Sequence, residues 1–157
     1  PNKRMHSHNF LPPYILEYFK SRARHYLDFN RIDPLGLHIN SVWVNETKIH
    51  EFNPVHIHQG ALFTGLSSVM FLKLCDMGPE ISRSDQPMNG RLQIMGNSSG
   101  QFVKSDYSPN VEERDFYLFP YDMRHCVYPH NNPNGIRRTL VVNMDIDYDP
   151  VKSRSAS

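Results

Sequence analysis

The sequence predicts a single domain dominated by β-strands, a sandwich or barrel preceded by one amphipathic helix. After Gly36 the chain carries many short runs rich in β-branched and aromatic residues, which favour strands. Segments rich in Pro, Asn, Gly, Ser and Asp separate these runs and are typical of turns. Many short strands with polar turns indicate a sandwich or barrel. We expect one domain over residues 1–150 and a disordered tail over 151–157.

The helix is predicted over residues 11–28. Its apolar and aromatic residues recur at a roughly helical spacing, with basic residues between them. Pro12 and Pro13 suit a first helical turn, where the missing amide donor costs nothing. We expect this helix to pack on the outside of a β core that spans residues 36–147.

The strands are predicted from alternating or continuous apolar runs. The runs cover residues 38–43, 55–63, 66–74, 90–95, 101–103, 116–119 and 139–146. Two polar segments, 77–89 and 105–114, have the composition of long loops that could cover the mouth of a site.

Composition excludes several classes of protein. The formal net charge is only +1, from 17 basic and 16 acidic residues, so nucleic acid is not an expected partner. The two cysteines, Cys75 and Cys126, form no metal-binding or disulfide pattern, which favours a reducing, cytoplasmic compartment. The longest apolar run, residues 66–74, is far below the ~20 residues that span a bilayer.

His56 and His58 are the first candidate metal ligands. On a strand, residues two apart face the same side, so both imidazoles would point into one cavity while Val55 and Ile57 point away. A His-x-His pair on a strand is also common as a surface feature. The pair therefore indicates a metal only together with further ligands.

His125 is the third candidate ligand. The predicted strand that ends at Phe119 is followed by a turn, and His125 opens the next strand two residues before Val127. A third imidazole delivered in this way would complete a three-ligand face and leave positions open for oxygen and a substrate. Cys126 should face away from such a metal.

Arg137 and Thr139 form a candidate carboxylate grip. An arginine offers a planar fork of two donors to a carboxylate, and a hydroxyl two residues along the same strand faces the same way. Arg138 should point to the opposite face. The alternative interpretation is a solvated basic pair on an edge strand.

These motifs together resemble the small iron(II)- and 2-oxoglutarate-dependent oxygenases, in particular short bacterial and phage members. The likeness spans roughly residues 40–146 and is carried by residues 53–73, 90–94, 118–129 and 135–143. The resemblance implies a double-stranded β-helix, or jelly roll, with an N-terminal helix against the larger sheet. It also implies the cofactors Fe(II) and 2-oxoglutarate.

The resemblance assigns roles to individual residues. It makes His56 the first metal ligand and His125 the distal ligand. Arg137 and Thr139 would hold the far carboxylate of 2-oxoglutarate. On the strand before the ligand pair, Trp43 and Asn45 stand where this family often has a pocket-lining aromatic residue and an amide, so they are further candidates for cofactor binding.

His58 departs from the commonest pattern of the family, which has Asp or Glu at this position. A neutral imidazole leaves the charge of the metal site one unit higher than a carboxylate would. Iron sites with three histidines exist in thiol dioxygenases, so His58 remains a candidate ligand. Glu51 and Asp76 are the fallback carboxylates.

The residues around the expected site are less well defined. Arg91 and Gln93 alternate on a predicted strand and could face the cavity. Three tyrosines, Tyr107, Tyr121 and Tyr128, could lie near its mouth.

The function expected from these features is a dioxygenase that hydroxylates an unknown substrate and releases succinate and carbon dioxide. Dioxygen and either a peptide, such as one with a prolyl side chain, or a small metabolite would be its partners. Two alternatives remain open. One is a cupin-like dioxygenase with three histidines that does not use 2-oxoglutarate, and the other is a noncatalytic jelly-roll module that binds a metal.

Overall fold

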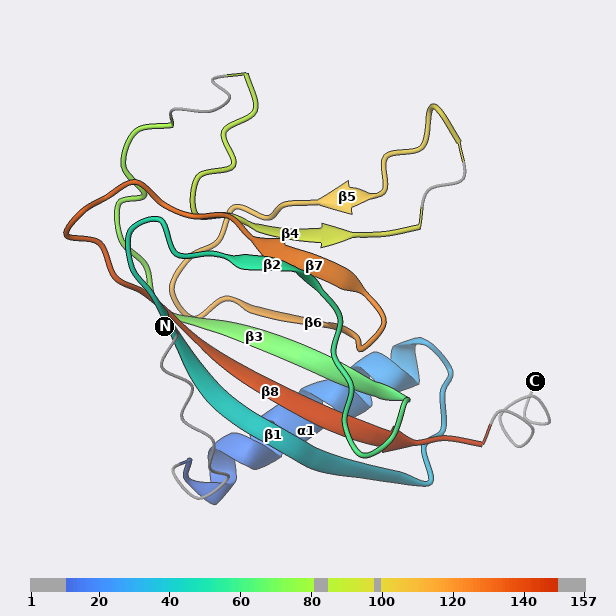
Figure 1. Cartoon of the computed structure of the whole chain (residues 1–157). Coiled ribbons are helices and arrows are strands. Elements are labelled where there is room, and N and C mark those ends of the chain that lie inside the picture. The colour runs from blue at the N-terminus through green and yellow to red at the C-terminus, as the bar shows by residue number, and fades with distance from the viewer. Residues whose placement is uncertain (1–10, 81–84, 98–99, 150–157) are drawn as a thin grey trace.

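Two four-stranded antiparallel sheets face each other in the structure, a computed structural model that describes residues 11–80, 85–97 and 100–149 (Figure 1). One sheet has the order β1 (Gly36–Thr47), β8 (Arg137–Asp147), β3 (Gly65–Lys73) and β6 (Phe116–Pro120). The other has the order β2 (Asn53–His56), β7 (Arg124–Val127), β4 (Leu92–Met95) and β5 (Asp106–Tyr107). Eight antiparallel strands paired in this way form a jelly roll, which confirms the predicted fold.

The helix α1 (Pro13–Phe29) covers the outer face of the first sheet (Figure 1). Pro13 opens the helix, where its lack of an amide hydrogen costs no bond. Phe19, Ala23 and Leu27 form its buried face and pack against side chains of β1 and β8. The prediction of a helix over 11–28 is therefore correct to within two residues at each end.

The strand β8 separates two apolar clusters. Leu140, Val142 and Met144 point toward α1 and belong to the cluster under the helix. Val141 points the other way, into the cluster between the two sheets. Residues at odd positions of β8 therefore face the interior of the jelly roll, because side chains alternate along a strand.

Two of the predicted strands are wrong. The strand expected over 55–63 ends at His56, and residues 57–64 follow an irregular path. No strand forms at 101–103, where the chain makes a turn, and the short strand β5 lies instead at residues 106–107, inside a segment predicted to be a loop. In both segments the backbone groups make isolated hydrogen bonds instead of a strand ladder: the amide of His58 donates to the carbonyl of Tyr121, and the amide of Val103 donates to the carbonyl of Gly100.

The loop predicted over residues 77–89 is found as far as the structure describes it, but its expected role at the mouth of the site is not supported. Residues 77–80 and 85–89 are irregular, as predicted, but none of them lines the cavity described below, so a lid role finds no support there. The expected tail at 151–157 lies outside the described residues. Among the described residues, no helix is long and apolar enough to cross a membrane.

The irregular segment 57–64 is tied to β8 through a buried carboxylate. The backbone amides of Ala61 and Leu62 donate hydrogen bonds to Oδ2 of Asp145, at 3.0 and 3.4 Å. Asp145 is only 4% exposed. Hydrogen bonds to an ionised acceptor are stronger than those between neutral groups, so this carboxylate fixes the path of the segment in place of ladder bonds.

Tyr121 also binds the carboxylate of Asp145, and we call Asp145 with its partners Ala61, Leu62 and Tyr121 the anchor of this segment. Tyr121 does not lie at the mouth of the site, where the sequence analysis had placed it. Its hydroxyl donates to Oδ1 of Asp145 at 3.0 Å, and its ring is 2% exposed. Burial, followed by this hydrogen bond, raises the pKa of the Tyr121 hydroxyl. The backbone carbonyl of Tyr121 also accepts from the amide of His58 at 2.9 Å, so the anchor reaches a candidate ligand directly.

Gly60 provides a test of this anchor. A Cβ atom at Gly60 would overlap the carboxylate of Asp145, which its hydrogen bonds hold in place. We expect Gly60→Ala to lower the free energy of unfolding by about 2 kcal/mol, measured by urea denaturation. Gly100→Ala is the control, because its Cβ would meet Val103 Cγ2 at an ordinary 3.4 Å. Equal stability of the two variants would contradict the anchor.

Candidate metal centre

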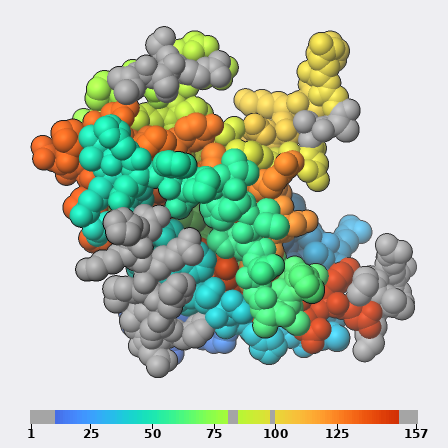
Figure 2. All heavy atoms as spheres, in the orientation of Figure 1, coloured from blue at the N-terminus to red at the C-terminus, as the bar shows by residue number. Residues whose placement is uncertain are grey.

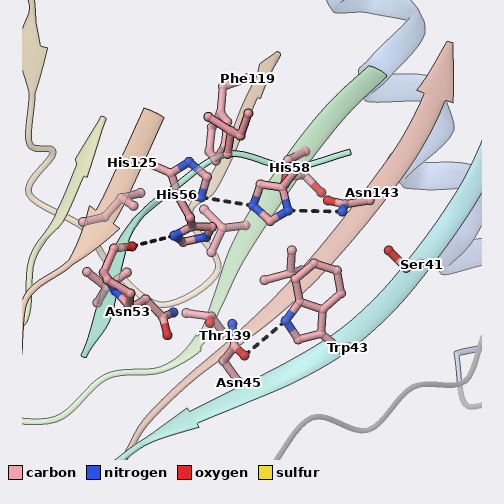
Figure 3. Close-up of a pocket in the computed structure, with 18 of the residues that line it drawn as sticks. Ser41, Trp43, Asn45, Asn53, His56, His58, Phe119, His125, Thr139 and Asn143 are labelled. Atoms are coloured by element: carbon pink, nitrogen blue, oxygen red, sulfur yellow. Dashed lines mark hydrogen bonds between the residues drawn. The ribbon is translucent and has the colours of Figure 1, made fainter. Parts of the chain in front are cut away.

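Three imidazoles converge between the two sheets (Figure 3). One ligand atom each from His56, His58 and His125 lies within 4.8 Å of the others. His56 on β2 and His125 on β7 are direct partners in the antiparallel register. His58 follows two residues after the end of β2. The three residues that the sequence singled out are thus brought together by the fold.

Hydrogen bonds at Nδ1 orient two of these rings. Nδ1 of His56 lies 2.7 Å from the carbonyl oxygen of Pro54, and Nδ1 of His125 lies 2.9 Å from that of Met123. A carbonyl can only accept, so each Nδ1 carries the proton and donates. Each Nε2 therefore keeps a free lone pair, which is the state that binds a metal.

The Nδ1 atom of His58 faces a side chain. Its Nδ1 lies 3.2 Å from the amide nitrogen of Asn143, on β8. Its Nε2 lies 3.1 Å from Nε2 of His125. Metal–nitrogen bonds of about 2.1 Å at right angles would separate two ligand nitrogens by about 3 Å, so this pair fits one cation.

Burial keeps His125 neutral. It lowers the pKa of His125 to about 4, with a smaller contribution from the nearby His56 and an opposing one from the Met123 carbonyl. Since only the neutral imidazole binds a metal, His125 is in the competent protonation state throughout the physiological range.

A cavity of about 500 Å³ adjoins the three histidines, within the range of about 300–1,000 Å³ typical of small-molecule sites. None of the described residues that line it is Asp or Glu. Glu51 and Asp76 lie elsewhere and accept hydrogen bonds from the backbone amides of Lys48 and Gly78. The fallback carboxylates are therefore wrong, and the candidate ligands are all imidazoles.

Arg137 is a buried cation at the wall of this cavity. It is 2% exposed, and its guanidinium packs over the ring of Phe71 at 5.0 Å. Its Nε and Nη2 have no hydrogen-bond partner among the described residues. Burial lowers the pKa of Arg137 to about 10, so it remains charged at neutral pH. A buried charge with unused donors is costly unless an anion pairs with it.

The neighbours of Arg137 on β8 divide as the alternation predicts. Thr139 also lines the cavity and is 2% exposed. Arg138 points to the other face, where its Nη2 lies 2.6 Å from a carboxylate oxygen of Glu46. The structure thus separates the buried arginine from the solvated one, and the interpretation of both as an exposed pair is wrong.

Trp43 and Asn45 also line the cavity, as expected (Figure 3). The indole Nε1 of Trp43 donates to Oδ1 of Asn45 at 3.1 Å. The Trp43 ring lies 5.8 Å from that of His58. Both side chains are less than 10% exposed, so they form a rigid wall beside the histidines.

Other expected neighbours do not reach the cavity. On β4 it is Leu92 that lines it, whereas Gln93 faces outward and accepts a hydrogen bond from the hydroxyl of Tyr128. Arg91 and Tyr107 do not line it either. Cys126 points away from the histidines, toward Gln93, as predicted.

Asn143 is the functional candidate that the sequence analysis missed. It lies two residues from Val141 and four from Thr139, so the same alternation that places Thr139 in the cavity also places Asn143 there. The signal was present in the spacing along β8.

A space-filling view shows one face of the molecule (Figure 2). The blue-green and green atoms of the segment that carries His56 and His58 spread over the near face of the molecule. Val55 and Ile57, which flank His56, are each 55% exposed. Val55 does not line the cavity, as expected, but Ile57 does, so the expectation that Ile57 points away from it is wrong. Both side chains reach solvent and do not pack into a core.

Comparison with known proteins gives one family and a set of similar structures. The model of a family described as "Putative 2OG-Fe(II) oxygenase" matches residues 41–143. No curated protein matches the sequence.

Three solved structures share the fold at low sequence identity. An oxidoreductase of the 2OG-Fe(II) oxygenase family from Burkholderia pseudomallei is 16% identical with a TM-score of 0.60, covering 86% of this chain and 59% of that one. A Pseudomonas putida prolyl-4-hydroxylase is 12% identical with a TM-score of 0.56, covering 94% and 72%. A viral collagen prolyl hydroxylase from Paramecium Bursaria Chlorella virus-1 is 11% identical with a TM-score of 0.56, covering 94% and 80%.

The lowered pKa of His125 predicts a pH dependence of stability. Because its pKa is about 4 in the folded protein and about 6.5 when unfolded, the unfolded chain binds more protons between these values. The free energy of unfolding of the metal-free protein should therefore fall by up to about 3 kcal/mol as the pH drops from 6.5 to 4.

Urea denaturation at pH 7.0 and 4.5, in the presence of a chelator, measures this loss. Other groups also titrate in the same range, so the comparison is with His125→Gln, which should lose less stability on acidification. A loss of the same size in both proteins would contradict the burial of a neutral imidazole.

Proposed function

Because the chain belongs to the family of 2OG-Fe(II) oxygenases, we propose that it is a 2-oxoglutarate-dependent dioxygenase that binds iron through His56, His58 and His125. The observation that carries this proposal is the pairing of two features in one cavity: three converging imidazoles and the buried, unpaired Arg137. A site for a divalent cation beside a site for a carboxylate suits a keto acid that is held at both ends.

The donor set of the chain fits both groups. Three neutral imidazoles suit Fe(II), which accepts nitrogen ligands. When bound, iron and 2-oxoglutarate supply the oxidising chemistry, in which dioxygen is consumed, 2-oxoglutarate is converted to succinate and carbon dioxide, and the substrate is hydroxylated. The protein contributes binding, orientation and the exclusion of water.

Arg137 and Thr139 would hold the far carboxylate of 2-oxoglutarate. The unused Nε–H and Nη2–H of Arg137 lie on the same edge of the guanidinium and can donate to the two oxygens of one carboxylate. Phe71 fixes the plane of this guanidinium from one side. The hydroxyl of Thr139, two residues along β8, can donate to the same group.

The remaining wall of the cavity is largely apolar. It includes Trp43, Leu92, Phe119 and Val141, whose side chains are all less than 10% exposed. Such a wall lowers the local dielectric constant and strengthens the attraction between Arg137 and a bound anion. The apolar lining therefore supports both retention of the cosubstrate and exclusion of water.

The substrate we propose is a peptide, with a prolyl side chain as one candidate, or a small metabolite. Two of the solved structures with this fold are prolyl hydroxylases by their names. The exposed apolar side chains of Val55 and Ile57 next to His56 would suit contact with a polypeptide. Dioxygen is the second substrate.

His58 favours a second candidate function. A dioxygenase with three histidine ligands could act on a small substrate directly, without 2-oxoglutarate. In that case Arg137 would bind the substrate's own anionic group. The third hypothesis is a noncatalytic module that binds a metal. Such a protein would retain zinc and would not turn over 2-oxoglutarate.

The activity itself is tested by succinate formation. We expect the protein loaded with Fe(II) under anaerobic conditions to convert 2-oxoglutarate to succinate only after oxygen is admitted. His56→Ala should reduce this turnover by more than about 100-fold, because it removes a proposed ligand. Protein that consumes no 2-oxoglutarate, with or without iron, would refute the proposal, and zinc found in it by metal analysis would favour the noncatalytic module.

The carboxylate grip is tested by binding. Arg137→Ala should weaken 2-oxoglutarate binding about 100-fold, as the loss of charge-assisted hydrogen bonds worth about 3 kcal/mol predicts. Trp43 is the one tryptophan of the chain and lines the cavity, so its fluorescence reports binding to protein loaded with Mn(II).

Arg138→Ala is the matched control, because Arg138 faces the opposite side and pairs with Glu46. It should bind 2-oxoglutarate as the unaltered protein does. If both variants bind 2-oxoglutarate equally well while Mn(II) binding persists, the assignment of Arg137 to its carboxylate is wrong. The hypothesis of a three-histidine dioxygenase that does not use 2-oxoglutarate would then be favoured.

A further inference from the structure

Asn143 is the side chain that faces Nδ1 of His58, one of the three candidate ligands. The rings of His56 and His125 each donate Nδ1–H to the carbonyl two residues before them. The equivalent nitrogen of His58 faces the side-chain amide of Asn143 at 3.2 Å. Asn143 is 3% exposed, so water does not compete for this contact.

The hydrogen bonds of this amide are incomplete. Its Nδ2 lies toward His58, while its Oδ1 has no partner among the described residues. With Nδ2 as donor, Nδ1 of His58 must accept, and the ring proton is then on Nε2, where it can bridge to Nε2 of His125 at 3.1 Å. That tautomer has no lone pair to offer a metal at Nε2.

A half-turn of the amide about its Cβ–Cγ bond reverses this. The two ends of an amide have nearly the same shape, so the turn exchanges Oδ1 and Nδ2 with little other movement. Oδ1 then accepts Nδ1–H of His58, and Nε2 gains the lone pair that a metal requires. All three histidines would then have the same tautomer.

The neighbours of Asn143 leave room for this turn. In the antiparallel register Asn143 lies between Ser41 on β1 and Ser67 on β3, both small. The hydroxyl of Ser67 is fully buried and has no hydrogen-bond partner in the part of the chain that the structure describes. Directly opposite residues lie about 5 Å apart, so this oxygen is placed to accept Nδ2–H after the turn.

We infer that Asn143 is the positioning residue that makes His58 a metal ligand, its Oδ1 holding the imidazole in the tautomer with a free Nε2. This inference rests on the proposed function, since it takes His58 as a ligand of the iron. It goes further in assigning to this chain's third imidazole a partner 85 positions away. The usual carboxylate ligand would need no such partner, because either of its oxygens can bind.

Metal affinity tests the inference without any turnover. Binding of Co(II) and Zn(II) is measured by competition with a chromophoric chelator. Asn143→Leu keeps the approximate shape but removes the acceptor, and it should weaken binding about 10–100-fold, as the loss of a ligand's hydrogen-bond partner does. Asn143→Asp supplies a stronger acceptor and should tighten binding relative to the unaltered protein.

Two controls separate the possible failures. Arg138→Ala alters the opposite face of the same strand without touching a histidine and should leave Co(II) affinity unchanged. His58→Ala should weaken binding at least as much as Asn143→Leu. Circular dichroism of each metal-free variant confirms that it is folded, and the Asp variant, which predicts a gain, keeps the test valid if the Leu variant unfolds.

The outcomes are distinct. Unchanged affinity in Asn143→Leu alongside a loss in His58→Ala would overturn the inference but leave the proposed ligands intact. Unchanged affinity in His58→Ala would overturn both. The tautomer itself is read from ¹⁵N spectra of the imidazoles with Zn(II) bound, where three Nδ1–H protons support the inference and a protonated Nε2 on His58 contradicts it.

Discussion

The lining of the cavity depends on the alternation of side chains along one strand, β8, in which every second residue faces the interior. Its odd positions place Arg137, Thr139, Val141, Asn143 and Asp145 on the interior face, where the first four line the cavity and the last fixes the ligand segment. The strand is paired on both sides, with β1 and β3. Because a slip of one residue would turn every side chain to the other face, this double pairing holds the carboxylate grip, the cavity floor and the partner of His58 in a single register.

The charges inside the cavity explain why orientation matters here. Arg137 is the one charged side chain among the described lining residues, and the three histidines are candidates for neutral ligands. With a divalent cation and a dianionic keto acid bound, the site would carry one net positive charge, whereas a carboxylate at position 58 would neutralise it. A neutral ligand binds a cation less strongly than an anion does. The orientation of each imidazole lone pair toward the metal would therefore contribute a larger share of the metal affinity in this chain than in a site with a carboxylate at position 58.

The sequence predicted those parts of the site that follow from strand alternation and missed those that depend on distant contacts. His125, Arg137 and Thr139 lie on regular strands, so their spacing determined their direction. His58 reaches the cavity for a different reason than predicted, because β2 has already ended and the carboxylate of Asp145 sets the path of its segment. Tyr121 looked like a rim residue, yet its hydroxyl serves that buried carboxylate. Neither contact leaves a local pattern, since each joins residues far apart in the chain.

The three candidate ligands differ in how rigidly the backbone holds them. His56 and His125 are cross-strand partners, so their relative position is as rigid as the sheet that carries them. His58 belongs to an irregular segment held by hydrogen bonds from its backbone to Tyr121 and, further on, to Asp145. Such a segment can open locally at a lower free energy than a central strand. A cation bound by all three imidazoles would join the segment to the sheet, so part of its binding free energy would appear as added stability of residues 57–64.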